Sequence, residues 1–192
     1  MTQEELMQKN PQWLYRIVMM YKALGEMAKH DRERIWESHW FNKPATMEMI
    51  RAVEAKLGVE LDKEYVEFLQ LSNGWQNFYH SSTLFGTYEF QSEAFQTAMS
   101  YLERMQDTFL ELRGTRNKLL PITLSNLTES VFVIVLDGHP KAGQVWWLQP
   151  DWEEDQLHIY RCENFVGFFE EMLNLIRDET DDLIAANQQN PQ

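Results

Sequence analysis

Val53–Trp75 reads VEAKLGVELDKEYVEFLQLSNGW, and this stretch carries the strongest fold signal in the chain. Gly58 follows an apolar helical stripe and predicts the end of one helix. Asp62 predicts the start of the next helix, because its side chain accepts free backbone N–H groups of a first turn. Asn73-Gly74 then predicts a helix stop, since both residue types tolerate a positive φ at low cost. We therefore expect the chain to turn sharply into extended structure at Trp75.

Apolar residues at helical spacing extend this pattern along the chain. On either side of Gly58, the predicted buried positions are Ile50, Val53 and Leu57, then Tyr65, Phe68, Leu69 and Ser72. Thr46 is the expected cap of the first of these two helices. The same spacing predicts an amphipathic helix within residues 4–30. We expect residues 1–43 to form an N-terminal helical extension that is packed on the main domain or appended to it.

Downstream of Trp75, short apolar and aromatic segments alternate with turn residues, which is typical of β-strands. The predicted strands are residues 75–80, 83–90, 119–124, 131–136, 144–149 and 156–161. Ser92 begins a predicted helix whose apolar face runs to Leu112. The closing helix is expected to bury Phe165, Phe168, Phe169, Met172 and Ile176.

This order of elements predicts the fold class. Helices come first, then sequential strands joined by short loops, then a closing helix, which indicates an α+β domain with a largely antiparallel sheet flanked by helices. We expect the domain to span residues 44–180 and residues 181–192 to form a frayed acidic and polar tail.

The formal net charge of −13 is unevenly distributed. Residues 1–43 hold seven Lys or Arg and six Asp or Glu, a balance of +1, whereas the remaining residues hold ten and twenty-four, a balance of −14. A negative field of this size repels phosphate backbones and attracts basic molecules. It therefore disfavours nucleic acid as a partner and favours a basic protein. The alternative is that the charge serves only solubility.

Several features of the chain favour a soluble intracellular protein. The single cysteine, Cys162, has no partner for an internal disulfide, which is typical of a reducing compartment. The first residues lack the pattern of a signal peptide, and no apolar run is long enough to cross a membrane. We expect a cytoplasmic protein that does not bind membranes.

The sequence contains no recognisable catalytic or metal-binding motif. The five histidines have no partner at metal-ligand spacing, and the eight glycines form no phosphate-binding loop. A nucleophile elbow is also absent, and Glu163 opposes activation of the neighbouring Cys162. We therefore expect no catalytic residue, no metal and no cofactor. An enzyme acting on a small substrate is the least favoured class.

The acidic loop, Asp151–Asp155, is the strongest candidate for partner binding. It places Asp151, Glu153, Glu154 and Asp155 around Trp152 on an expected hairpin connection. Carboxylates steer a basic partner, and an exposed indole anchors it. The alternative is a soluble turn whose indole folds back onto the sheet. Tyr79 and His80, at the end of a predicted strand, are the next candidates.

The stretch Val53–Trp75 resembles the opening signature of the SUKH superfamily. The matching positions are Glu54, Leu57, Gly58, Leu61, Tyr65, Phe68, Leu69, Asn73 and Gly74. Asp62 stands where family members often have Pro, and both residue types suit a helix start. The order of elements is also similar over about residues 44–177. The shared residues imply packing and turn roles, so they indicate the fold rather than a site.

The resemblance also implies a function. Many bacterial SUKH proteins are immunity proteins that neutralise toxins, several of which are nucleases, whereas fungal relatives are linked to cell-wall synthesis and signalling. We therefore expect a protein that blocks a basic, nuclease-like toxin domain by stoichiometric binding and occlusion. The alternative is a regulatory or scaffold module that binds an endogenous protein. The helix within residues 4–30 would suit that role if Trp13 and Leu14 faced outward.

Overall fold

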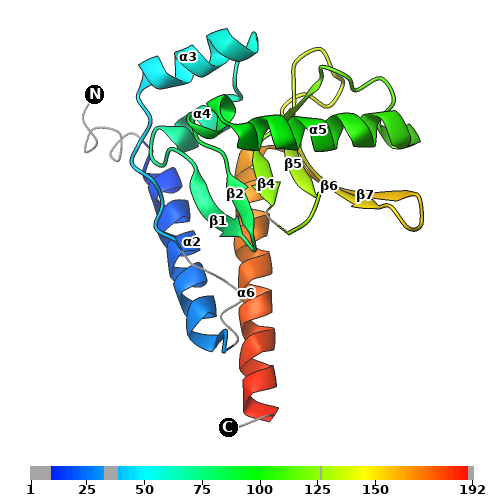
Figure 1. Ribbon diagram of the computed structural model, residues 1–192. Coiled ribbons are helices and arrows are strands. Elements are labelled where there is room, and N and C mark those ends of the chain that lie inside the picture. Colours follow the sequence, from blue (N-terminus) through cyan, green and yellow to red (C-terminus); the bar gives the residue numbers. More distant parts are fainter. Residues whose placement is uncertain (1–9, 33–38, 126, 190–192) are drawn as a thin grey trace.

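The structure of the protein is a computed structural model, in which residues 10–32, 39–125 and 127–189 are described (Figure 1). The α-helices are α2 (Pro11–His30), α3 (Met47–Leu57), α4 (Lys63–Leu69), α5 (Glu93–Thr108) and α6 (Phe165–Gln189). Two 3-10 helices are η1 (Glu89–Gln91) and η2 (Leu110–Leu112). The strands are β1 (Trp75–Tyr79), β2 (Ser82–Leu84), β3 (Leu119–Pro121), β4 (Thr123–Ser125), β5 (Val131–Val135), β6 (Val145–Asp151) and β7 (Gln156–Cys162).

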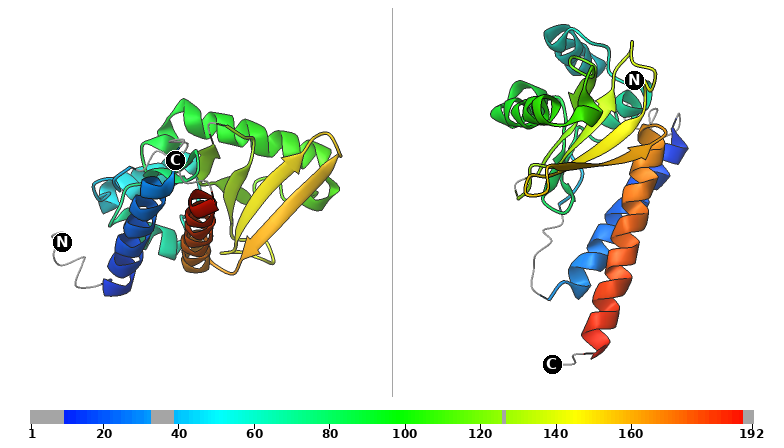
Figure 2. Two further views of the ribbon diagram at one scale, coloured as in Figure 1. Left: turned by 90° about the horizontal axis from the view of Figure 1, so that it is seen from below. Right: turned by 90° about the vertical axis from the view of Figure 1, so that its right-hand side faces the viewer.

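The strands form two antiparallel sheets, with the orders β1-β2-β4 and β3-β5-β6-β7. Helices α5 and α6 lie on opposite sides of the strands, as the right-hand view of Figure 2 shows. The predicted α+β class with a largely antiparallel sheet is therefore confirmed. Strand β5 is buried along its whole length because it lies between β3 and β6 and under both helical layers.

The core is rich in aromatic side chains. Those with no more than 1% exposure include Tyr65, Phe68, Trp75, Phe78, Phe85, Phe90, Phe165, Phe168 and Phe169. Each fully buried side chain of this size contributes about 1.5–3 kcal/mol of hydrophobic free energy. The predicted inward face of the closing helix is confirmed, since all five of its expected residues are buried.

The Asn-Gly junction differs in detail from the prediction. Helix α4 ends at Leu69, before the junction, so Asn73-Gly74 does not supply the helix stop. Gly74 does have a positive φ of 81°, and a Cβ there would lie 2.5 Å from the backbone nitrogen of Gly86. Asn73 accepts a hydrogen bond from the Thr87 backbone N–H at 2.7 Å. The junction therefore binds the turn after β2 closely to the start of β1.

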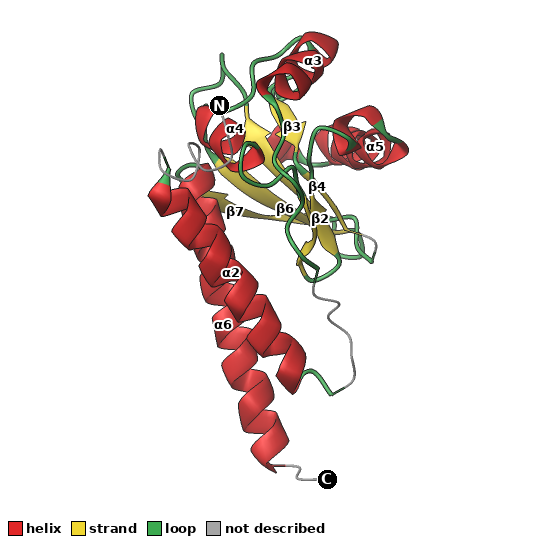
Figure 3. Cartoon of the chain, turned by 90° about the vertical axis from the view of Figure 1, so that its left-hand side faces the viewer, coloured by secondary structure: helices red, strands yellow, loops and turns green. Residues whose placement is uncertain are grey.

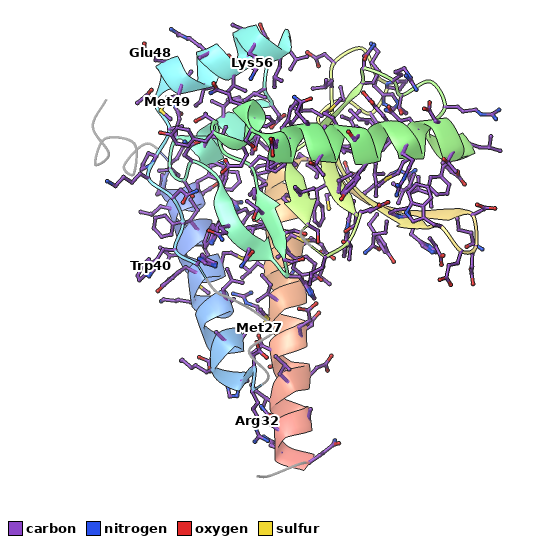
Figure 4. All side chains as sticks on the ribbon, in the orientation of Figure 1. Met27, Arg32, Trp40, Glu48, Met49 and Lys56 are labelled. Carbon is purple, nitrogen blue, oxygen red and sulfur yellow. The ribbon has the colours of Figure 1, made fainter. Side chains whose placement is uncertain are left out.

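Other residues of the opening stretch also connect neighbouring segments. The Glu54 carboxylate accepts a hydrogen bond from the Leu61 N–H at 3.0 Å, which spans the turn that Gly58 begins at a φ of 69°. The buried Tyr65 hydroxyl donates to the Phe85 carbonyl at 2.5 Å. Helix α3 lies above these contacts and points Glu48 and Lys56, near its two ends, into solvent (Figure 4).

Two predicted strands are shorter than expected. The segment 83–90 is a strand only to Leu84, because Phe85 and Phe90 turn into the core through η1. The segment 119–124 is divided at Ile122, whose N–H donates to the Phe132 carbonyl and whose carbonyl accepts from the Phe85 N–H. The chain therefore passes from one sheet to the other at this residue. Helix α5 ends at Thr108, and η2 continues to Leu112.

Helices α2 and α6 run side by side in the same direction and extend together beyond the sheets (Figure 3). An ion pair joins Arg16 to Glu170 at 2.7 Å, and the Asn187 side chain donates to the His30 carbonyl at 2.8 Å. Because α6 continues to Gln189, the expectation of a frayed tail is not met for residues 181–189, which are helical. Residues 190–192 of that tail lie outside the described residues.

The N-terminal extension packs on the domain through α2. Trp13 is only 3% exposed, and its ring lies 5.4 Å from that of Phe169 and 5.7 Å from that of Phe165. The arrangement in which Trp13 faces outward is therefore contradicted. Beyond α2, Trp40 is 69% exposed at the outer edge of the molecule and stacks on Tyr21 at 4.2 Å (Figure 4).

Candidate functional site

A row of aromatic side chains crosses the larger sheet on the face turned away from α5. Strand register places Phe132 opposite Trp147, and Trp147 opposite Tyr160. The Phe132 and Trp147 rings stack at 5.0 Å, and the Trp147 and Tyr160 rings lie 5.5 Å apart. Helix α6 covers the Phe132 end of the row, where Phe168 packs at 5.0 Å. Tyr160 closes the other end and is 57% exposed.

Two adjoining hollows of about 430 and 280 Å³ open beside this row, between β6, β7, the β1–β2 turn and α6. They share Tyr79, Trp147 and Gln149 as lining residues. We call the combined depression the trough. The left-hand view of Figure 2 shows α6 beside the β6–β7 hairpin. Residues of α6 line one side of the trough, and residues of the hairpin line the other.

The trough is lined by two carboxylates that project from α6, Glu171 and Glu179. Among its described lining residues there is no Lys or Arg. Glu179 Oε1 accepts a hydrogen bond from the Tyr79 hydroxyl at 2.9 Å and lies 2.9 Å from His80 Nε2. Within the described residues, Glu179 Oε2 has no hydrogen-bond partner, and Glu171 forms no hydrogen bond or ion pair.

Two proton-bearing groups of the trough have raised pKa values. Burial, helped by the negative charge of Glu179, raises the pKa of the Tyr79 hydroxyl, which therefore stays a neutral donor. Burial and the charge of Glu171 raise the pKa of the Cys162 thiol in the same way. A raised thiol pKa disfavours the reactive thiolate, so this environment does not activate Cys162 as a nucleophile.

The structure places two of the predicted partner-binding residues at the trough. Tyr79 and His80 both line it, at the turn between β1 and β2. Tyr79 is only 7% exposed, because its ring packs edge-on against Trp147 at 5.7 Å. His80 adopts a positive φ of 51°, which directs the tight turn into β2. Tyr79 therefore forms a wall of the trough rather than a projecting contact.

The acidic loop connects β6 to β7. Asp151 Oδ1 accepts the backbone N–H groups of Glu153 and Glu154 at 3.1 and 3.2 Å, which shapes the turn. Glu153, Glu154 and Asp155 are exposed, so their charges face solvent. Side chains alternate along β6, and Asp151 shares the trough face with Trp147 and Gln149. The loop and the trough are thus two ends of one hairpin surface.

Trp152 lies on the other side of that hairpin. Its ring packs 5.1 Å from Phe109, and the Arg104 guanidinium lies 4.3 Å above it. The indole therefore folds back, as in the second of the two alternatives, but onto α5 and its end rather than onto the sheet. The carboxylates of Glu153, Glu154 and Asp155 therefore face solvent. The Trp152 indole instead packs against other residues of the protein.

Sequence reasoning missed the residues that bring the trough together. Alternation along β6 and β7 was a usable signal, because it places Trp147, Gln149, His158 and Tyr160 on one face. Glu171 and Glu179 carried no comparable signal. They belong to the polar side of a long helix, and only the crossing of α6 over the sheet brings them to this face.

The described residues form neither a metal-ion cluster nor a membrane-spanning helix. In residues 10–32, 39–125 and 127–189, no group of three or more His, Cys, Asp or Glu side chains is placed to hold a metal ion. No helix within these ranges is both long and apolar enough to cross a membrane.

Comparison with known families gives one match. Residues 44–171 match the model of the SMI1 / KNR4 family (SUKH-1). The match begins after the segment that contains α2 and covers the elements from α3 into the first part of α6. No curated protein matches the chain.

Proposed function

This chain belongs to the SMI1 / KNR4 (SUKH-1) family, and from that premise we propose that it is an immunity protein that neutralises a toxin by stoichiometric binding. The family includes toxin-immunity proteins, and it is a family of binding modules rather than of catalysts. The partner we propose is a basic, nuclease-like toxin domain, met in the cytoplasm.

The observation that supports this proposal is the surface of the β6–β7 hairpin. One end carries the exposed carboxylates of Glu153, Glu154 and Asp155, and the other end opens into the trough with Glu171 and Glu179. Aromatic side chains lie between these two acidic groups. Such a combination supplies both long-range attraction for a basic protein and apolar area for contact.

The proposed mechanism is occlusion. A nuclease needs a positively charged groove to bind a phosphate backbone, and this groove is complementary to an acidic protein surface. The formal charge of −13 accelerates encounter, and the aromatic row then slows dissociation by burying apolar surface. Neutralisation requires no chemical step by the immunity protein.

The test is affinity purification of the tagged full chain from its native host, grown in contact with competing cells. Killing of an unprotected recipient strain verifies that toxin is being delivered. Tyr160→Asp is the paired control bait, because Tyr160 is exposed on the hairpin surface and its replacement leaves the buried core untouched. We expect the wild-type bait to retain a basic effector domain in one-to-one amount and the control bait to retain less.

Other outcomes of this purification are equally informative. Retention of resident envelope or signalling proteins would favour the regulatory or scaffold module. That alternative has lost its first argument, since Trp13 packs inward. A bait that retains no effector while the unprotected strain is being killed would contradict the immunity function.

A further inference from the structure

We infer that the trough is a docking site for an arginine side chain of the protein partner. The inference rests on the proposed function only in that the partner is a protein. It names the contact that the trough would make, which is a guanidinium placed against Tyr160 and Trp147 and attracted by the carboxylates of Glu171 and Glu179, one in each hollow and about two helical turns apart on α6.

The first argument is a comparison within the hairpin itself. Trp146 lies under the Arg161 guanidinium at 5.1 Å, and Trp152 lies under that of Arg104 at 4.3 Å. Arg104 is also ion-paired with Glu129, so an aromatic ring and a carboxylate hold one arginine between them. On the opposite face, Trp147 has no cation over its ring within the described residues. Its ring packs against those of Phe132, Tyr79 and Tyr160, and carboxylates line the two hollows beside it.

The second argument is the charge of the trough. Glu171 has no ion-pair or hydrogen-bond partner among the described residues, and Glu179 uses only Oε1. Because none of the described residues that line the hollows is Lys or Arg, neither carboxylate is neutralised by a lysine or arginine among them. A carboxylate close to apolar walls attracts a cation more strongly than one in bulk water, since the local dielectric constant is lower.

The third argument concerns two polar atoms that are shielded from solvent. Trp147 Nε1 is a donor and Glu179 Oε2 is an acceptor, and both lack hydrogen-bond partners within the described part of the chain. Both residues line the same hollow. Buried polar atoms are normally paired, so the unpaired Glu179 oxygen marks a place where an incoming donor gains a hydrogen bond. A guanidinium has donors but no acceptor, so the Trp147 N–H would remain for a water or a carbonyl group of the partner.

Arginine fits these features better than lysine does. Its guanidinium is planar, stacks on aromatic faces and offers donors in a fork that engages carboxylates. The exposed ring of Tyr160 provides the open face for stacking, and Glu171 and Glu179 lie on the α6 side of the hollows. A lysine ammonium would satisfy the charge but would gain less from the rings.

The experiment uses the full chain and needs no toxin. The indole N–H resonances of the ¹⁵N-labelled protein are followed during titration with N-acetyl-arginine amide, and Trp147→Phe assigns the Trp147 signal. The citrulline analogue, which has the same shape without the charge, is the matched ligand control. We expect a saturable shift of the Trp147 signal with the arginine probe and weaker binding of the citrulline probe.

Variants of the chain test the carboxylates. Glu171→Gln and Glu179→Gln are each expected to weaken binding of the arginine probe about two- to fivefold, the usual loss for one partly exposed ion pair. Glu179→Gln retains an oxygen that can accept from the Tyr79 hydroxyl, so the trough keeps its shape. Glu48→Gln, an exposed carboxylate on α3 that lies outside the hairpin surface, is the matched control and is expected to leave binding unchanged.

Equal binding of the two probes, or binding unaffected by both glutamine variants, would overturn the inference. That failure would leave the proposed function intact if the wild-type bait still retained an effector, because the acidic loop would then be the contact. Arginine binding without retention of any effector would instead uphold the docking site and reject the immunity function.

Discussion

At the scale of single residues, the Asn73-Gly74 junction shows how two adjacent positions perform different tasks. Gly74 supplies the positive φ and the absence of a side chain, which lets the Gly86 backbone approach closely. Asn73 keeps an ordinary φ and uses its amide, donating to the Thr87 hydroxyl at 2.9 Å and accepting from the Thr87 N–H. A close approach of two backbone segments, rather than a helix stop, explains the pair.

Gly74→Ala is expected to lower the free energy of unfolding by more than the roughly 1–2 kcal/mol that a left-handed φ costs an alanine. The excess arises because the new Cβ would overlap the Gly86 backbone, which has little freedom to move. Gly58→Ala is the matched control, since Gly58 has a similar φ of 69° and open space around it. Urea unfolding of both variants measures the difference, and equal losses would reject the close-approach explanation.

Tyr79 makes stability depend on pH in the alkaline range. Its raised pKa means that the folded protein holds the phenolic proton after the unfolded chain has lost it. Stability is therefore fully present below the unfolded pKa of about 10 and falls as pH rises from there towards the folded pKa. Tyr79→Phe should remove this contribution, which is at most about 1.4 kcal/mol per pH unit.

Urea midpoints measured at several values from about pH 9 to about pH 11 test this expectation. The exposed Tyr15 provides the matched control, because Tyr15→Phe should retain the wild-type decline. A Tyr79→Phe protein with an undiminished decline would show that Tyr79 is not its source.

At the scale of elements, the β6–β7 hairpin separates two kinds of side chain by strand alternation. Trp146, Leu148 and the turn residue Trp152 lie towards α5, where arginines and apolar groups cover them. Trp147 and Tyr160 lie towards the trough and are only partly covered. The same hairpin is therefore both a core element and the proposed contact surface.

The charges of the acidic loop should control the rate of association. Replacing Glu153 and Glu154 with Lys is expected to slow binding of the basic effector by up to about tenfold at low salt and to weaken its salt dependence. Stopped-flow association at several salt concentrations measures both effects. The same change at Glu48 and Glu60, exposed residues in and just after α3, is the control and should have a smaller effect. Association unchanged by the loop variant would remove the loop from the interface.

At the scale of the whole molecule, α2 joins the N-terminal extension to the domain core. Its buried residues are Trp13, Ile17, Met20, Ala23, Leu24 and Met27. Trp13 contacts aromatic rings of both α4 and α6, and its indole donates to Glu67 at 3.2 Å. Residues 1–43 lie outside the family match, and the structure nevertheless uses α2 to complete the core.

Removal of residues 1–43 is therefore expected to leave a chain with poorly fixed tertiary packing. The lost burial of several large side chains, at about 1.5–3 kcal/mol each, is comparable with the whole stability of a domain. Near-UV circular dichroism and binding of a hydrophobic dye measure the effect. Single substitutions in α2 give a milder test. Trp13→Ala should lower the free energy of unfolding by about 3–5 kcal/mol, whereas Tyr15→Ala at an exposed site should lower it by less than about 0.5 kcal/mol. A truncated chain with native packing would show that the extension is merely appended.

Much of the fold was determined by local sequence. Helical spacing predicted the buried face of α6, the caps of α3 and α4 were placed at Thr46 and Asp62, and the apolar run of residues 131–136 predicted strand β5. These features depend on the periodicity of neighbouring residues, which is set by the geometry of each element alone. The predicted ends were less accurate where a chain segment changes sheets, as at Ile122.

The candidate site was decided by tertiary structure. The trough joins Tyr79 from the β1–β2 turn, Trp147 and Tyr160 from the hairpin, and Glu171 and Glu179 from α6. Strand alternation makes Trp147 face away from Trp146, but the position of α6 over the sheet determined that carboxylates line the hollows beside Trp147. Helix crossing depends on the packing of side chains distant in sequence, and local periodicity contains no information about that packing.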